Sequence, residues 1–110
     1  MSEVSTHVLD TSRGEPAAGV AVRLERQGSA GSWQDFGTDV TGADGRARGF
    51  PAPLAGIYRL TFDTSGYFED LGVKTFFPVV VVCFRVSATR LRYHVPLLVS
   101  PFGYTTYRGS

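Results

Sequence analysis

Apolar and polar residues alternate along several short stretches of this chain, which is the period-two pattern of a β-strand with one buried and one exposed face. The pattern is clearest at residues 90–99, where Leu91, Tyr93 and Val95 alternate with Arg92 and His94. The apolar row is expected to face the core, so His94 is expected to point away from it.

The end of the chain has the features of a hairpin. Residues 100–103 contain the proline and glycine of a tight turn, and residues 104–107 form a second extended run rich in threonine and tyrosine. Together with residues 90–99 they predict two paired strands that hold the C-terminus in the fold.

The same alternation, bounded by turn signals, predicts six further strands and one short helix. The strands are expected at residues 4–9, 20–25, 33–41, 47–50, 57–63 and 76–84, and the helix at residues 64–72. About eight short strands separated by turns indicate an all-β sandwich or barrel. In the first strand, His7 lies on the face opposite Val4 and Val8.

Residues 76–84 are apolar at nearly every position, so both faces of this strand are expected to be covered. A two-layer sandwich covers only one face, and the other face suggests a contact with another subunit. Cys83 lies within this run, where burial is expected to keep its thiol unreactive.

Length and composition narrow the class of protein. The 110 residues fit a single domain, residues 1–110, and a formal net charge of +1 gives no reason to expect nucleic acid or an anionic membrane as a partner. The one cysteine excludes an intramolecular disulfide and fits a reducing compartment. With no leader pattern at its start and no apolar run long enough to span a bilayer, the chain is expected to be soluble and cytoplasmic.

Few residues have side chains that could act in catalysis or bind a metal. The chain has two histidines, too few for a catalytic zinc site, which generally needs three protein ligands. His7 and His94 share one outer face if their strands lie in one sheet, and Arg46 follows the Asp-Gly pair of a turn. The best candidate group consists of these three residues together with Arg90, Arg92 and Tyr107. Spacing alone nevertheless favours exposed polar residues on a binding module over a catalytic site.

The two ends of the chain resemble the signatures of a known family. The Tyr-Arg-Gly-Ser ending at residues 107–110, preceded by residues 93–106, closely resembles the closing signature of the transthyretin-related 5-hydroxyisourate hydrolases. Residues 6–20 resemble that family's opening signature. Segments 41–46, 58–62 and 76–78 fall in the expected order, so the resemblance covers the whole chain.

This resemblance implies a transthyretin-like β-sandwich of two four-stranded sheets with one short helix. It also implies a homotetramer, a dimer of dimers with the active sites in the central channel, and an enzyme that needs neither a metal nor another cofactor. The implied reaction opens the N1–C6 amide of 5-hydroxyisourate, the product of urate oxidation, to give 2-oxo-4-hydroxy-4-carboxy-5-ureidoimidazoline.

The family's active-site positions carry over residue by residue. The catalytic positions match His7, Arg46 and His94, and the substrate-binding positions match Tyr107, Arg108, Gly109 and Ser110. Either histidine could activate the water or donate the proton, and Arg46 could hold the substrate and its developing negative charge. Two residues depart from the family pattern: Val79, where an acidic residue is common, and Arg92, where histidine is often found.

Two other functions compete with the hydrolase. A transthyretin-type carrier of a small ligand would share the fold, but such carriers lack the two histidines and the Tyr-Arg-Gly-Ser ending. An immunoglobulin-like interaction module would show similar strands and turns, and a monomer without a channel would favour it.

Overall fold

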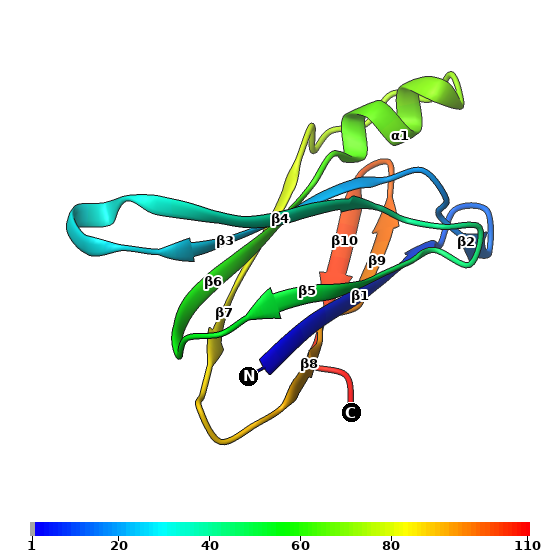
Figure 1. Cartoon of the computed structure of the whole chain (residues 1–110). Helices are drawn as coiled ribbons and strands as arrows, with labels where there is room; N and C mark the ends of the chain where they lie inside the picture. Colours follow the sequence, from blue (N-terminus) through cyan, green and yellow to red (C-terminus); the bar gives the residue numbers. More distant parts are fainter. Residues whose placement is uncertain (1) are drawn as a thin grey trace.

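The structure is a computed structural model that describes residues 2–110. Two β-sheets pack face to face, and one helix lies at one end of them (Figure 1). The strands are β1 (Ser2–Asp10), β2 (Glu15–Pro16), β3 (Ala21–Gln27), β4 (Trp33–Val40), β5 (Arg46–Ala52), β6 (Gly56–Phe62), β7 (Val80–Val86), β8 (Arg92–His94), β9 (Leu97–Ser100) and β10 (Gly103–Thr106). A 3-10 turn, η1 (Ser29–Gly31), joins β3 to β4, and the helix is α1 (Thr64–Asp70).

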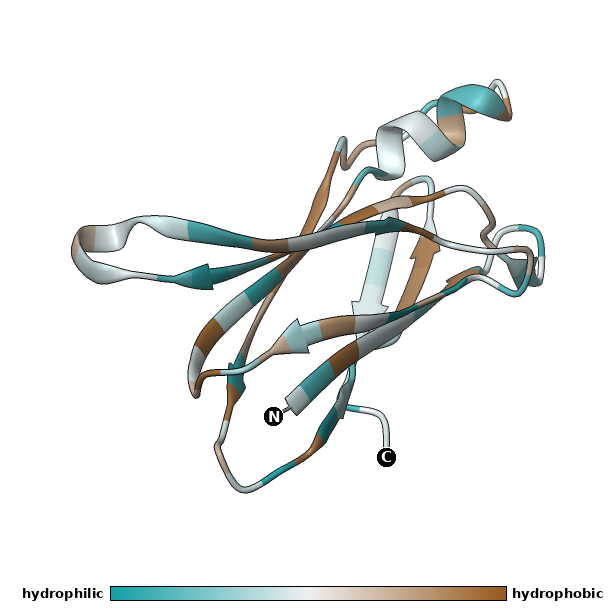
Figure 2. Ribbon diagram, viewed as in Figure 1, coloured by the Kyte–Doolittle hydropathy of each residue, from teal (hydrophilic) through white to brown (hydrophobic). Residues whose placement is uncertain are grey.

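The first sheet has six strands, with β1 at its centre. Strand β1 pairs antiparallel with β5 and β2 on one side, and parallel with β8 and β9 on the other, while β10 pairs with β9. The second sheet has four strands in the order β4-β3-β6-β7. Hydrophobic residues run along β7 and β9, which belong to different sheets (Figure 2).

The side chains between the sheets form one apolar core. Those with the largest fully buried volume are Tyr58, Phe62, Phe68, Leu24, Leu60 and Leu97. The burial pattern of β1 alternates along its whole length, as the sequence predicts, with Val4 and Val8 buried and His7 partly exposed on the opposite face. Burial of this apolar row fixes which face of β1 carries its polar residues.

The all-β sandwich with two sheets and one short helix is confirmed, but the strand count differs from the prediction. The first sheet has six strands instead of four, because β2 is an additional two-residue strand and the predicted strand 90–99 is divided into β8 and β9. Pro96 lies at the division and has no N–H to donate, yet β8 and β9 pair with β1 in the same register.

Strand β7 also differs from the prediction. It begins at Val80 and not at residue 76, and it forms one edge of the second sheet. Its outer face is not covered within the chain: Val81 is 45% exposed, and Cys83 is exposed rather than buried. The prediction that Cys83 is buried is therefore wrong for the single chain, because the residue falls on the outward side of the alternation.

Helix α1 is fixed at its start and on its inner side. Asp63 caps it by accepting a hydrogen bond from the N–H of Gly66 at 3.0 Å. The hydroxyl of Tyr67 donates to the buried carboxylate of Asp10 at 2.8 Å, which ties the helix to the end of β1.

No helix within residues 2–110 is long and apolar enough to cross a membrane.

Candidate functional site

Three neighbouring strands of the first sheet, β5, β1 and β8, place the candidate residues on one outward face. His7 on β1 stands directly opposite Arg46 on β5, and Ser5 on β1 stands opposite His94 on β8. Ser5 and His7 are two residues apart on one strand, so their side chains share a face. The structure therefore brings His7, Arg46 and His94 together, although they are far apart in the sequence.

The turn before β5 delivers Arg46 to this face. Gly45 has φ = +78°, a conformation that favours glycine, and its carbonyl accepts a hydrogen bond from the N–H of Val8 at 2.7 Å. The turn lies so close to β1 and the following segment that a Cβ on Gly45 would come within 3.3 Å of the backbone nitrogen of Ala17. Only glycine fits here, which explains the position of the Asp-Gly pair.

Asp44 organises the cationic part of the site, and the sequence interpretation did not assign it a role. Its carboxylate accepts a hydrogen bond from the N–H of Arg46 at 3.0 Å. It also lies 3.8 Å from Nε of Arg46 and 3.4 Å from Nη2 of Arg48. One feature of the sequence could have indicated this cluster of charges. Arg46 and Arg48 are two residues apart on one strand, which places both guanidinium groups on the outer face.

The hydrogen bond of His7 defines its tautomer. Nε2 of His7 lies 2.8 Å from the backbone carbonyl oxygen of Asp44. A carbonyl oxygen only accepts hydrogen bonds, so Nε2 must carry the hydrogen and donate it. Neutral His7 therefore has its lone pair on Nδ1.

His94 is held from two sides. Its Nδ1 lies 2.8 Å from the hydroxyl oxygen of Ser5, and its carbonyl accepts a hydrogen bond from the N–H of Gly109 at 2.8 Å. Gly109 lies against the imidazole so closely that a Cβ there would be 2.6 Å from Cδ2 of His94. The N-terminal strand and the C-terminal tail thus meet at β8, at the end of the molecule where both termini lie (Figure 1).

The surroundings of His94 favour its neutral form. Partial burial lowers the pKa of His94 below the usual 6.5, and the positive charges of Arg46 and, to a smaller extent, His7 lower it further. A neutral imidazole can accept a proton, so His94 is suited to act as a base near pH 7.

A small cavity of about 160 Å³ opens beside these groups. Its lining residues come from β1, β5 and β8 and are Ser5, Thr6, Arg46, Arg48 and His94. The cavity therefore combines an imidazole with two guanidinium groups, the set needed to hold an oxygen-rich anion and move a proton. Ser5 and Arg48 were missed as candidates, although each lies two residues from a candidate on the same strand.

The four terminal residues do not all lie at this cavity in the single chain. Only Gly109 packs on His94, whereas Tyr107 and Arg108 line a second hollow of about 280 Å³ beside β7. Tyr107 is 57% exposed, and Ser110 is exposed at the end of the chain. The substrate-binding role of these residues stays a prediction.

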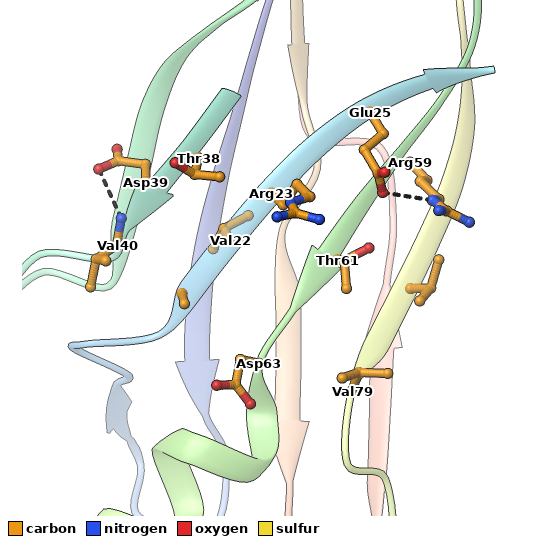
Figure 3. A pocket seen from close by; sticks show the side chains of 12 residues that line it. Val22, Arg23, Glu25, Thr38, Asp39, Val40, Arg59, Thr61, Asp63 and Val79 are labelled. Carbon is orange, nitrogen blue, oxygen red and sulfur yellow. Dashed lines mark hydrogen bonds and ion pairs between the residues drawn. The ribbon is translucent and has the colours of Figure 1, made fainter. Parts of the chain in front are cut away.

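A larger hollow, about 820 Å³, lies on the outer face of the second sheet (Figure 3). Its charged centre is occupied by an ion pair, with Nε of Arg59 2.9 Å from Glu25, and Arg59 also lies 4.0 Å from the ring centre of Trp33. Val79, one of the departures from the family pattern, lines this hollow. Both histidines lie on the other sheet, so this hollow lacks the groups that could move a proton near pH 7.

The described part of the chain offers no obvious metal site. Within residues 2–110, no group of three or more His, Cys, Asp or Glu side chains is arranged to hold a metal ion. The groups that the small cavity does offer are the imidazole of His94 and the guanidinium groups of Arg46 and Arg48.

Comparison with known proteins gives one consistent result. The model of the HIUase/Transthyretin family matches residues 4–109. The 5-hydroxyisourate hydrolase of Mus musculus is 43% identical over 113 residues, which cover 99% of this chain and 96% of that protein. The solved structure of the Klebsiella pneumoniae 5-hydroxyisourate hydrolase has a TM-score of 0.88 at 41% identity and covers 100% of both chains.

Transthyretin itself is also similar. Sea bream transthyretin, solved in complex with thyroxine, has a TM-score of 0.89 at 33% identity, covering 96% of this chain and 93% of that chain. The backbone is thus common to hydrolases and to a thyroxine-bound protein, and the side chains must distinguish the two functions. On sequence and on structure alike, the chain belongs to the HIUase/Transthyretin family.

Proposed function

We propose that this protein hydrolyses 5-hydroxyisourate to 2-oxo-4-hydroxy-4-carboxy-5-ureidoimidazoline in the degradation of urate. The observation that carries the proposal is the placement of His7, Arg46 and His94 on one face of the first sheet, beside a cavity that His94 and Arg46 line. Relatives named 5-hydroxyisourate hydrolase over nearly the full length of the chain support it.

The reaction follows from the protonation states of these groups. His94, neutral near pH 7, takes a proton from a water molecule while the water oxygen forms a bond to the C6 carbonyl carbon. The guanidinium of Arg46 stabilises the oxyanion that develops on that carbonyl. When the N1–C6 bond breaks, the imidazolium of His94 returns the proton to N1, which leaves a ureide N–H and a carboxylic acid that ionises.

His7 has a supporting part in this scheme. Its Nε2–H is engaged with the carbonyl of Asp44, so the bare Nδ1 is the nitrogen that can accept a hydrogen bond from the substrate or the water. Arg46 stands opposite His7 in the pairing of β1 with β5, which places His7 next to a residue that lines the cavity. The terminal residues Tyr107 to Ser110 complete the pocket wall in this proposal.

The carrier function is the main alternative, and backbone similarity does not decide against it, since sea bream transthyretin matches as well as the hydrolase does. The side chains favour the hydrolase, because a carrier needs no imidazole with its pKa lowered beside a guanidinium group. Membership of the HIUase/Transthyretin family also removes the reason to consider an immunoglobulin-like module.

The proposal includes a homotetramer, a dimer of dimers with the sites in its central channel. Strands β7 and β10 are edge strands, whose unpaired backbone groups can pair with another copy. Phe76 and Phe102 are 70% and 73% exposed, and another copy of the chain could cover these two rings. A cytoplasmic location is also proposed, because the exposed free thiol of Cys83 fits a reducing compartment.

The direct test follows the ultraviolet absorbance of 5-hydroxyisourate freshly generated from urate by urate oxidase. The proposed hydrolase should accelerate its decay far beyond the spontaneous rate at catalytic concentrations of protein. Binding of thyroxine with no acceleration of the decay would instead support the carrier. Sedimentation velocity on the same sample should give the mass of four chains.

A further inference from the structure

Ser5 forms the only hydrogen bond found for the imidazole of His94 within residues 2–110. Its hydroxyl oxygen lies 2.8 Å from Nδ1 of His94, and the two residues are direct partners in the parallel pairing of β1 with β8. The pairing of β1 with β5 shifts register between Val4 and Thr6, where β5 has one extra residue, so Ser5 lies opposite a β-bulge in β5. Bulges of this kind re-aim side chains and are frequent beside active sites.

The imidazole has little freedom to give up this contact. Turning the ring over would exchange Nδ1 with Cδ2 and place the nitrogen against the methylene of Gly109, which lies on the Cδ2 edge and can neither donate to it nor accept from it. A turned ring would therefore lose a hydrogen bond and gain none. The two contacts, Ser5 on one edge and Gly109 on the other, fix which nitrogen remains for the cavity: it is Nε2.

A serine hydroxyl can either donate a hydrogen bond or accept one, and the two cases have opposite consequences. If Ser5 donates to Nδ1, the hydrogen of neutral His94 is on Nε2, and the nitrogen facing the cavity cannot take a proton. If Ser5 accepts from Nδ1–H, the lone pair is on Nε2 and the imidazole can act as a base. The hydrogen bond at one ring nitrogen thus sets the chemistry at the other.

We infer that Ser5 is a positioning residue, which accepts a hydrogen bond from Nδ1–H of His94 and keeps Nε2 bare as the base of the reaction. The inference rests on the proposed function, because that function needs a lone pair at the cavity. Arg46 and Arg48 on β5 line the cavity, and burial together with the charges of Arg46 and of His7 on β1 favours a neutral ring, for which the choice of tautomer matters.

The tautomers can be read directly by ¹⁵N–¹H correlation spectra of the imidazoles in the full-length protein without substrate. The chain has two histidines, and a His7→Gln variant assigns the signals of each. In the wild type His94 should show a protonated Nδ1 and a bare Nε2, whereas His7 should show the opposite pattern because its Nε2–H donates to Asp44. His7 is therefore an internal reference for the other tautomer.

Two substitutions of Ser5 complete the test. Ser5→Ala should move His94 toward the Nε2–H tautomer and lower kcat/KM by about 10- to 100-fold, as for removal of the hydrogen-bond partner that orients a metal-ligating histidine. Ser5→Thr keeps the hydroxyl on a residue that strands accept, and should restore both the spectrum and most of the activity. Dispersed amide spectra of both variants would show that they are folded.

Three outcomes would overturn the inference. The first two are spectra: a wild-type His94 with its hydrogen on Nε2, or a His94 spectrum that Ser5→Ala leaves unchanged. The third is an unchanged kcat/KM in a Ser5→Ala protein in which the tautomer of His94 has moved. These outcomes differ from failure of the proposed function. A protein that shows the expected tautomers but does not accelerate the decay of 5-hydroxyisourate would remove the proposed reaction, while the contact between Ser5 and His94 would still be established by the spectra.

Discussion

Gly109 packs directly on the imidazole of His94: its N–H donates to the carbonyl of His94 at 2.8 Å, and a Cβ there would be 2.6 Å from Cδ2. Real Cβ atoms do not approach so closely, so Gly109→Ala must push the ring or the tail aside. Since misplacing a catalytic group by about 1 Å can cost about 10²-fold in rate, kcat/KM should fall by about that factor.

The matched control for this substitution is Gly103→Ala. A Cβ at Gly103 would be 3.7 Å from Oγ of Ser100, an ordinary contact, so this variant should keep its activity. Steady-state kinetics of the two alanine variants, with circular dichroism to confirm folding, make the comparison. Equal activities would show that the packing of Gly109 on His94 has no part in catalysis.

Arg46→Lys should lower kcat/KM by about 10²- to 10³-fold, the loss typical when a donor to a developing oxyanion is removed. Lysine keeps the charge but not the planar set of donors that can hold the substrate and contact Asp44 at once. Arg13→Lys is the control, since Arg13 pairs with Glu15 on the surface at 2.8 Å. A lysine variant as active as the wild type would mean that charge alone suffices at this position.

The pH dependence should report the environment of His94. Its pKa is lowered by burial and by the charges of Arg46 and His7, so kcat/KM should stay high as the pH falls to 6.5 and decline only below it. In a titration followed by the Cε1 proton of His94, Arg46→Met should move the midpoint upward, toward 6.5. His7, which contributes to the lowered pKa of His94, and Arg48, which lines the cavity, are both still present in the variant. A wild-type midpoint at or above 6.5 would contradict the assigned base.

Tyr67→Phe should destabilise the protein by about 1–3 kcal/mol at pH 7, because it removes a donor from the buried carboxylate of Asp10. Burial alone would raise the pKa of Asp10, but the hydrogen bonds from Ser12, Tyr67 and the backbone outweigh it and lower the pKa below 3.8. The stabilisation is therefore full above pH 3.8 and disappears as the pH falls through the lower pKa of the folded state.

Urea unfolding at fixed protein concentration measures this effect at pH 7 and in acid. The difference in free energy between wild type and Tyr67→Phe should shrink as Asp10 is protonated. Tyr104→Phe is the control, because Tyr104 is exposed at the surface. A difference that persists undiminished in acid would show that the Asp10 carboxylate is not its source.

The sequence predicts much of the fold because burial of one face imposes a period of two. The alternation in β1 correctly placed Val4, Val8 and His7 on their faces. In residues 90–99 the alternation was correct from Tyr93 onward, but the prediction that Leu91 faces the core was wrong: Leu91 precedes β8 and is 68% exposed. The start of β7 could not be found this way, since residues 76–84 are apolar on both sides and show no period. The exposure of Cys83 was missed for the same reason.

The site was only partly predictable. The two histidines and Arg46 could be named from motifs, but that they share one face depends on the pairing of β1 with both β5 and β8, which joins residues about 90 positions apart. Ser5 and Asp44 escaped notice because they act on neighbours through hydrogen bonds that only the folded chain forms. The sequence also could not show that Tyr107 lines a different hollow from His94, because this depends on the path of the chain after β10.

The measurement that tests the whole account most directly is the decay of 5-hydroxyisourate catalysed by three proteins: wild type, His94→Ala and Arg23→Ala. Arg23 lines the larger hollow on the outer face of the second sheet, and His94 lines the small cavity on the first. We expect His94→Ala to lose about 10²- to 10⁴-fold in kcat/KM, as for removal of a general base, and Arg23→Ala to match the wild type. A fully active His94→Ala protein, or a wild type no faster than the spontaneous reaction, would contradict the account.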